Sequence, residues 1–169
     1  MSLRPQCPVI TVGGTNGKGS TCAMLEAIYT KAGYRTGVFA SPHLLRYNER
    51  IRLANAEVDD DTIISSFEII DCARNDVSLT YFEFSFLAAL DVFLKQDADL
   101  IILEVGLGGR WDAANVLDPD CAIVTNVGLD HMEYLGETRE KIGAEKAAIF
   151  RGGGAHAICG DEDPPQSIL

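Results

Sequence analysis

Short apolar runs alternate along this sequence with longer segments of helical spacing, and this alternation restricts the fold more than any other feature. The runs typical of buried strands span residues 9–12, 36–40, 100–105, 121–126 and 155–159, and the segments of helical spacing span residues 20–32, 62–73, 80–96 and 137–150. A shorter alternating stretch, Glu49 to Leu53, predicts an edge strand or an ordered loop. Strands that alternate with helices predict an α/β domain with a largely parallel central sheet flanked by helices.

A glycine-rich segment joins the first strand to the first helix. It reads Gly13-Gly14-Thr15-Asn16-Gly17-Lys18-Gly19-Ser20 and is followed by Thr21. Glycines allow backbone N–H groups to approach an anion, and a helix N-terminus adds a partial positive charge. Lys18 can reach the β- and γ-phosphates, and Ser20 or Thr21 can offer a hydroxyl to Mg²⁺. The segment therefore predicts a P-loop, Rossmann-like domain that binds ATP through residues 14–21.

The spacing of this loop departs from the standard phosphate-loop pattern. Three residues separate Gly13 from Gly17, and Gly19 stands between Lys18 and Ser20. The alternative is an ordinary glycine-rich turn between a strand and a helix. The dinucleotide-binding glycine pattern is not matched either, which disfavours NAD. The combination of strand, glycines, lysine, hydroxyls and helix still favours a phosphate site.

Polar residues stand at or after the ends of predicted strands, where parallel sheets bind their ligands. Ser41 precedes Pro42 and is either a turn serine or a ligand. Glu104 lies inside a buried run, and a buried carboxylate requires a partner, either a metal ion or a basic side chain. His131 follows Asp130. A lone histidine is usually structural, and its chemistry as a ligand favours Zn²⁺ or Mn²⁺ over Mg²⁺.

The charge and cysteine content exclude some classes of protein. The formal net charge of −11 disfavours binding to nucleic acids or to anionic membranes. The five cysteines are far apart and form no Cys-x-x-Cys pair, so we expect reduced thiols in the cytoplasm. The most apolar stretch, residues 82–94, contains two acidic residues and is too short to span a bilayer.

Several motifs together resemble the folylpolyglutamate and dihydrofolate synthases of the Mur ligase superfamily. The first is the loop of residues 14–20, including the additional Gly19. The others are Ser41-Pro42-His43-Leu44, Asn48-Glu49-Arg50-Ile51, Thr80-Tyr81-Phe82-Glu83-Phe84, Glu104-Val105-Gly106-Leu107-Gly108-Gly109-Arg110, Asn126-Val127-Gly128-Leu129-Asp130-His131 and Glu145-Lys146-Ala147. They follow the order expected for the family and cover nearly the whole chain.

This resemblance implies an ATP-dependent amide ligase of folate biosynthesis and polyglutamylation. In the implied reaction, a carboxylate of dihydropteroate or a folate attacks the γ-phosphate of ATP, and the amine of L-glutamate then displaces phosphate from the acyl phosphate. ATP and Mg²⁺ are the implied cofactors, the partners are small-molecule substrates, and a monomer is expected. The sequence does not distinguish addition of the first glutamate from addition of later ones.

The resemblance also implies roles for individual residues. Lys18, Glu104, His131 and Lys146 form the expected catalytic set, and Ser41, Glu104 and His131 are the expected ligands of a second Mg²⁺. In the family the lysine at position 146 is carbamylated. The alternative is a surface lysine paired with Glu145 or Glu140. Such a carbamate requires a neutral amine, and hence a depressed lysine pKa.

Two further segments are expected to contact substrate. Residues 80–83 match a folate-contacting segment, although Thr80 and Glu83 also have the spacing of a helix capping box. The rings of Tyr81 and Phe82 can face a pterin. Arg110 and Trp111 follow three glycines in the loop of residues 106–115 and are also expected to face substrate.

Residues 1–160 are expected to form the central ATP-binding domain. Residues 161–169, which include Pro164-Pro165, are expected to begin a linker to a C-terminal domain. One alternative function is a Mur-type ligase of cell-wall peptides, which Gly19 and residues 80–84 disfavour. The other is a nucleotide-binding fragment that is inactive in isolation.

Overall fold

The computed structural model describes residues 5–151 and 154–169. Within these residues seven strands form one sheet: β1 (Val9–Gly13), β2 (Thr36–Phe39), β3 (Ile51–Leu53), β4 (Ala56–Glu57), β5 (Leu100–Glu104), β6 (Cys121–Val124) and β7 (His156–Cys159). The strand order is β4-β3-β2-β5-β1-β6-β7, and all pairs from β2 to β7 along this order are parallel. The predicted α/β fold with a largely parallel sheet is therefore confirmed.

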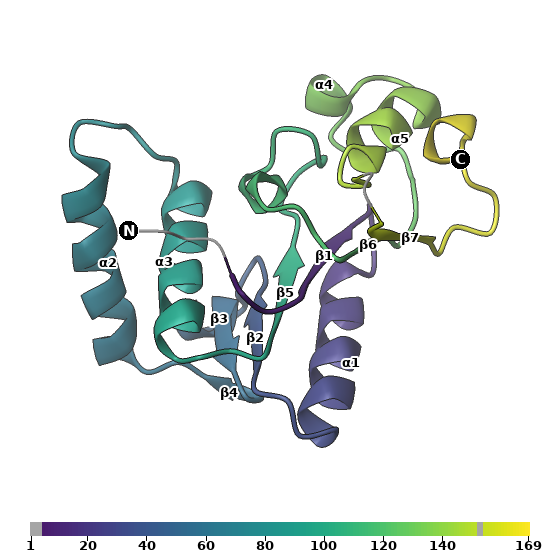
Figure 1. The fold of residues 1–169 in the computed structure, drawn as a ribbon. Coiled ribbons are helices and arrows are strands. Elements are labelled where there is room, and N and C mark those ends of the chain that lie inside the picture. Colours follow the sequence, from purple (N-terminus) through teal and green to yellow (C-terminus); the bar gives the residue numbers. More distant parts are fainter. Residues whose placement is uncertain (1–4, 152–153) are drawn as a thin grey trace.

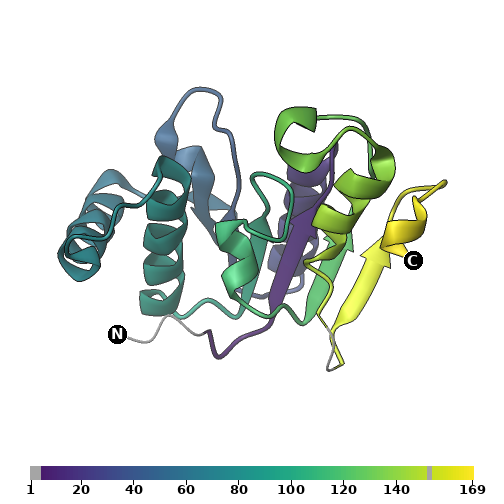
Figure 2. The same ribbon diagram turned by 90° about the horizontal axis from the view of Figure 1, so that it is seen from above.

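The helices lie on both faces of this sheet. They are α1 (Lys18–Lys31), α2 (Asp60–Arg74), α3 (Tyr81–Lys95), α4 (Met132–Leu135) and α5 (Arg139–Ala147), and three short 3-10 helices span Tyr47–Arg50, Ala113–Val116 and Gln166–Ile168. Helix α1 lies on one face, and α3 lies on the other with α2 outside it (Figures 1 and 2). The alternation of side chains along a strand explains this arrangement, since Val9 packs on the α3 side and Ile10 on the α1 side.

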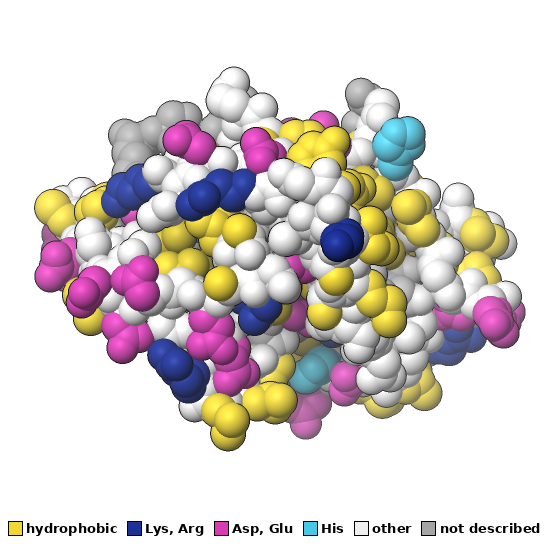
Figure 3. Space-filling view, turned by 90° about the horizontal axis from the view of Figure 1, so that it is seen from below, with side chains coloured by type: hydrophobic (Ala, Val, Ile, Leu, Met, Phe, Trp, Pro, Cys, Tyr) yellow, Lys and Arg dark blue, Asp and Glu magenta, His cyan; other side chains and the backbone are white. Residues whose placement is uncertain are grey.

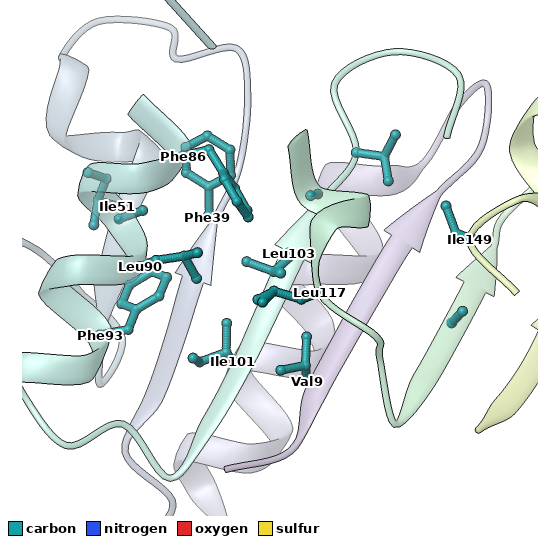
Figure 4. Packing of buried hydrophobic residues seen from close by; sticks show 14 of the residues in the cluster. Val9, Phe39, Ile51, Phe86, Leu90, Phe93, Ile101, Leu103, Leu117 and Ile149 are labelled. Carbon is teal, nitrogen blue, oxygen red and sulfur yellow. The ribbon is translucent and has the colours of Figure 1, made fainter. Parts of the chain in front are cut away.

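The larger of the two cores lies between the sheet and α3. Phe39 packs edge to face against Phe82 and Phe86, with ring centroids 5.4 and 5.7 Å apart. Phe93 and Ile101 are fully buried in the same cluster, as Figure 4 shows. This packing fixes α3 against β2 and β5 and therefore fixes the position of its N-terminus near the ends of these strands.

Most element boundaries match the sequence, and the differences have local causes. The stretch at residues 49–53 forms the end of a 3-10 helix and then β3, which runs antiparallel to β2. It is not an edge strand, because β4 pairs with its other side and forms the edge of the sheet. The last predicted helix begins only at Arg139, because the Thr138 side chain accepts a hydrogen bond from the Lys141 N–H and caps it. The short helix α4 was not predicted.

The C-terminal residues pack against α5. The Glu140 carboxylate accepts hydrogen bonds from the backbone N–H groups of Gln166 and Ser167, each at 3.0 Å, and Ile168 is buried. Residues 161–169, whose composition predicts a linker, therefore pack against the domain through Gln166, Ser167 and Ile168. The expected boundary near residue 160 remains a prediction.

The outer surface is of mixed character. On the face opposite to the view of Figure 2, hydrophobic side chains are interspersed with acidic and basic ones (Figure 3). Met24 and Ile28 of α1 are two of the exposed hydrophobic residues. No helix in the described ranges combines the length and apolar character needed to cross a membrane.

Candidate functional site

The glycine-rich loop is held in shape by the segment that follows β6. Asn16 donates its backbone N–H to Asn126 Oδ1 at 3.0 Å, and its carbonyl accepts from Asn126 Nδ2 at 3.2 Å and from Thr125 Oγ1 at 2.7 Å. Thr15 Oγ1 accepts from the Gly128 N–H at 2.9 Å. These bonds connect two segments that lie far apart in sequence, and they fix the loop ahead of α1 to the segment after β6.

The loop leads directly into α1 with Lys18 as the first helical residue. Gly17 has a φ of 82°, a left-handed conformation that glycine adopts at little cost. Lys18 Nζ donates to the carbonyls of Gly14 and Thr15 at 3.0 and 3.2 Å. The Thr21 hydroxyl donates to the Gly17 carbonyl at 2.9 Å, whereas Ser20 is exposed. Of the two hydroxyls expected to face a metal ion, that of Ser20 is the more accessible.

Glu104 ends β5 next to this loop. Its Oε2 accepts a hydrogen bond from the Ser41 N–H at 2.9 Å. Burial raises the pKa of Glu104, and this effect outweighs the lowering by the Ser41 N–H and by the Lys18 ammonium. A Cβ on Gly19 would lie 3.8 Å from Glu104 Oε1, so the carboxylate directly faces the start of α1. The structure therefore brings Ser41 and Glu104 together beside the loop.

Lys146 of α5 is buried, with only 4% of its surface exposed. Burial and the nearby Lys18 ammonium lower the pKa of Lys146 to about 8, and Asp130 opposes this shift. None of the hydrogen bonds or ion pairs among residues 5–151 and 154–169 engages its ammonium group. Lys146 is not the surface lysine of the alternative interpretation, and it lies within the electrostatic range of Lys18.

His131 lies on the loop that leads into α4. Its φ is 48° and its Nε2 lies 3.7 Å from Asp130 Oδ2, with about half of the side chain exposed. No hydrogen bond or ion pair of the described residues joins it to Ser41 or Glu104. Among all residues that the structure describes, no three His, Cys, Asp or Glu side chains lie close enough together to hold a metal ion. Its role as a metal ligand remains a prediction.

A cavity of about 340 Å³ opens beside the N-terminus of α3. The residues that line it include Thr80, Phe82, Glu83, Trp111 and Tyr134. The capping box is confirmed, because Thr80 Oγ1 accepts from the Glu83 N–H and Glu83 Oε2 accepts from the Thr80 N–H. The cap fixes the end of the helix, while the rings of Phe82 and Trp111 provide an aromatic lining.

Two residues expected beside substrate have other neighbours. Tyr81 does not line this cavity and instead stacks with Arg50, whose Cζ lies 5.1 Å from the ring centroid. Arg110 Nε donates to Glu145 Oε1 at 3.0 Å, and this pair connects the glycine-rich loop after β5 to α5. Arg110 thus positions the residue next to Lys146.

Two residues of the site were not identified from the sequence. Asp112 accepts hydrogen bonds from the N–H groups of Gly106, Leu107 and Ala114, and it shapes the loop that lines the cavity. Burial raises the pKa of Asp112. Asn126 was recognised only as part of the motif of residues 126–131, although its side chain binds the glycine-rich loop. Its position at the end of the predicted strand of residues 121–126 was the available signal.

Residues 12–168 match the model of the Mur ligase middle domain. The dihydrofolate synthase/folylpolyglutamate synthase of Escherichia coli strain K12 is 51% identical over 166 residues, which cover 98% of this chain and 39% of that protein. The chain therefore spans about two fifths of the length of this curated relative.

Solved structures resemble the chain equally closely. E. coli FolC in complex with DHPP and ADP matches with a TM-score of 0.96 at 51% identity, over 98% of this chain and 40% of that one. A bifunctional folylpolyglutamate synthase/dihydrofolate synthase with Mn, AMPPNP and L-glutamate bound matches with a TM-score of 0.92 at 52% identity, over 99% of this chain and 40% of that one.

Proposed function

Because this chain belongs to the Mur ligase middle-domain family, we propose that it is the ATP-binding part of an amide ligase that joins L-glutamate to dihydropteroate or to folates. The family resemblance inferred from the motifs is confirmed by the comparisons. The observation that carries the proposal is the position of the glycine-rich loop. It lies at the carboxyl edge of the sheet with Lys18 close to both Glu104 and Lys146.

The loop would hold the phosphates of ATP. The backbone N–H groups of residues 14–21 and the N-terminus of α1 favour an anion at this position. Lys18 now donates to two carbonyls of its own loop, and a nucleotide would offer phosphate oxygens in their place. With the phosphates fixed, a substrate carboxylate can be aligned for attack on the γ-phosphate, and the amine of L-glutamate can then attack the acyl phosphate.

The donor set at the edge of the sheet fits a divalent, oxygen-preferring cation. The Glu104 side chain is buried and has no basic side chain as an ion-pair partner among the described residues. Burial raises its pKa, and Mg²⁺ would stabilise the ionised carboxylate. We propose Glu104, Ser41 and His131 as ligands, and the Ser20 hydroxyl for the ion on the nucleotide. Such ions stabilise negative charge on phosphoryl oxygens.

Lys146 is proposed to act as a carbamate. With a pKa of about 8, roughly a quarter of its amine is neutral at pH 7.5, against about 0.1% at the ordinary value of 10.5. A neutral amine can attack CO₂, forming an N–C bond and losing one proton, which converts the side chain into an anion. That anion would relieve the repulsion between two neighbouring lysines and orient groups around the metal.

The cavity at the N-terminus of α3 is proposed to receive the pterin part of the substrate. Phe82 and Trp111 offer aromatic faces, and Glu83 and Thr80 offer polar atoms at the same opening. Arg110 would act indirectly, by holding Glu145 and the adjoining loop. Tyr81 would act with the loop after β2.

The organisation and cellular setting are part of the same proposal. Residues 1–160 would form the central ATP-binding domain, with residues 161–169 leading into a further domain. The five free cysteines suit a reducing cytoplasm. The negative net charge disfavours nucleic acid as a partner. A monomer that acts on small molecules is proposed.

The test is a substrate panel with ATP and Mg²⁺. Phosphate release should depend on both L-glutamate and dihydropteroate or tetrahydrofolate, in the protein that carries this chain, and should be lost in Glu104→Ala. Phosphate release with a nucleotide-linked cell-wall peptide and no response to folates would contradict the proposal. Titration of this chain with ATP tests the nucleotide site separately.

A further inference from the structure

Arg50 is a buried cation that has no carboxylate partner. It ends the 3-10 helix Tyr47–Arg50 and is 8% exposed. No ion pair in the described ranges includes Arg50, and the six residues outside those ranges carry no acidic side chain. Burying a charge is costly unless an opposite charge or hydrogen-bond acceptors compensate for it. Its position therefore requires an explanation.

Neighbouring side chains hold the guanidinium in one orientation. Arg50 Nε donates to His43 Nδ1 at 2.7 Å. Cζ lies 5.1 Å from the centroid of Tyr81 and 6.0 Å from that of Tyr47, so both rings contribute cation–π attraction. The Arg50 carbonyl also accepts from the Ala40 N–H at 3.0 Å, which fixes the backbone beside the end of β2. These contacts orient the group without neutralising it.

The two terminal nitrogens of Arg50 are free to bind a ligand. A guanidinium has five N–H donors, and only the one on Nε is used. The other four have no acceptor in residues 5–151 and 154–169. Neither terminal nitrogen is among the fully enclosed polar atoms that lack a partner, so both reach an accessible surface. Two parallel N–H groups in a fixed plane match the two oxygens of a carboxylate.

The location places this donor pair at the proposed active edge. Ala40 precedes Ser41, whose N–H binds Glu104. Tyr81 is the first residue of α3 and lies between two residues that line the aromatic cavity, Thr80 and Phe82. Arg50 thus connects the loop after β2 with the N-terminus of α3.

We propose that Arg50 binds a carboxylate of a substrate, with Tyr81 and Tyr47 enclosing the carbon chain next to it. The assignment rests on the proposed function and names a recognition residue for it. A carboxylate is the anion proposed here because its two coplanar oxygens match the paired N–H donors. The phosphates of ATP also have their own loop.

The experiment is an NMR titration of this chain with labelled arginine side chains. L-Glutamate and dihydropteroate are added separately at constant ionic strength, and the methyl ester of each acid serves as a control. We expect at least one acid to shift the Arg50 Nε–H resonance in the wild-type chain, and its ester to leave that resonance in place. The acid that acts identifies which substrate supplies the carboxylate.

Matched variants separate binding from general charge. Arg50→Gln should lower the affinity for the acid at least tenfold. Arg50→Lys should lower this affinity less, because the positive charge remains although the paired donors are lost. Arg46→Gln removes the same charge from an exposed neighbour and should change the affinity less than twofold. Equal affinities of wild type and Arg50→Gln, no binding of either acid, or binding without a shift of the Arg50 resonance would each overturn the assignment.

Titration with ATP keeps this proposal separate from the previous one. ATP should bind Arg50→Gln as tightly as the wild-type chain, since Arg50 is not part of the phosphate loop, and this result also confirms that the variant is folded. If the wild-type chain does not bind ATP, the result would count against the proposed ligase function alone. Intact ATP binding with no carboxylate response at Arg50 would count against the present inference alone.

Discussion

The side chain of Asn126 binds both backbone polar groups of Asn16, with Oδ1 accepting from the N–H at 3.0 Å and Nδ2 donating to the carbonyl at 3.2 Å. The two residues lie on different segments, one in the glycine-rich loop and one directly after β6. Asn16 sits at the outermost part of the loop and is exposed. The shape of the loop therefore depends on the neighbouring strand as well as on its own glycines.

Asn126→Ala should weaken ATP binding about tenfold, because the loop loses two hydrogen bonds that keep its N–H groups oriented. The free energy of unfolding should fall by about 1–2 kcal/mol, the usual contribution of two such bonds. Calorimetric titration and thermal unfolding measure the two effects. Gln96→Ala removes an amide at the end of α3, remote from the loop, and should leave ATP affinity unchanged. An unaltered affinity in Asn126→Ala would show that the loop is rigid without this contact.

Lys18→Ala should reduce ATP affinity by at least tenfold, since the ammonium is the positively charged side chain expected to contact the phosphates. Lys31→Ala is the matched control, because Lys31 lies in the last turn of the same helix and is exposed. Calorimetric titration of the two variants and of the wild-type chain decides the point. Similar affinities for all three would remove Lys18 from the nucleotide site.

Glu104→Gln should remove the divalent ion proposed to bind Glu104 while leaving the ion on the nucleotide, and the number of bound Mn²⁺ ions measured by electron spin resonance should fall by one. The variant should also change how stability depends on pH. Burial raises the pKa of Glu104 in the folded chain above its ordinary value of 4.5. The folded state therefore holds its proton more tightly, and this contribution to stability is lost as pH rises through the folded pKa.

Without metal, the wild-type chain should thus lose stability relative to Glu104→Gln as pH rises above about 4.5. Saturating Mn²⁺ and nucleotide should reverse the difference, because the ion binds only the ionised carboxylate. Denaturant unfolding at several pH values, with and without the ion, measures both. Equal Mn²⁺ binding in the two proteins would exclude Glu104 as a ligand.

The fold was largely predictable because its signals are local. The runs that became β1 and β5 are apolar and buried along their whole length, as expected for strands covered on both faces. Helix α4 was missed because only four residues form it, too few for any periodicity. The packing of Ile168 on α5 was missed because a Pro-Pro pair is typical of linkers as well as of ordered turns.

The site was predictable where a residue type is unusual for its surroundings. Glu104 inside an apolar strand is such a case, and its contact with Ser41 agrees with their expected places at one sheet edge. Asn126, Asp112 and Arg50 were missed because their roles arise from contacts between distant segments. Arg50 contacts His43 in the loop after β2 and Tyr81 in α3. The spacing of these residues in the sequence does not predict that they lie together.

Lys146→Met should make the chain more stable at neutral pH while abolishing ligase activity. The wild-type ammonium is buried beside Lys18, and its pKa of about 8 lies below the ordinary value of 10.5 because the charged form is disfavoured. The gain should be on the order of 1–2 kcal/mol, because the substitution removes the cost of burying the charge. A methionine of similar length fills the same space without a charge.

The pH dependence provides the control for this last variant. Between pH 8 and 10.5 the unfolded chain keeps a proton on Lys146 that the folded chain has released, so the wild-type chain gains stability relative to Lys146→Met as pH rises through this window. The cysteines titrate in the same pH range in both proteins, so their contribution cancels in the difference between the two free energies of unfolding. Labelled bicarbonate should give a carbamate signal in the ¹³C NMR spectrum of the wild-type chain that is absent from Lys146→Met. A constant stability difference across the window, together with no carbamate signal, would mean that Lys146 stays protonated in the folded protein. Lys146 would then contribute a positive charge beside Lys18, and the proposed carbamate would be wrong.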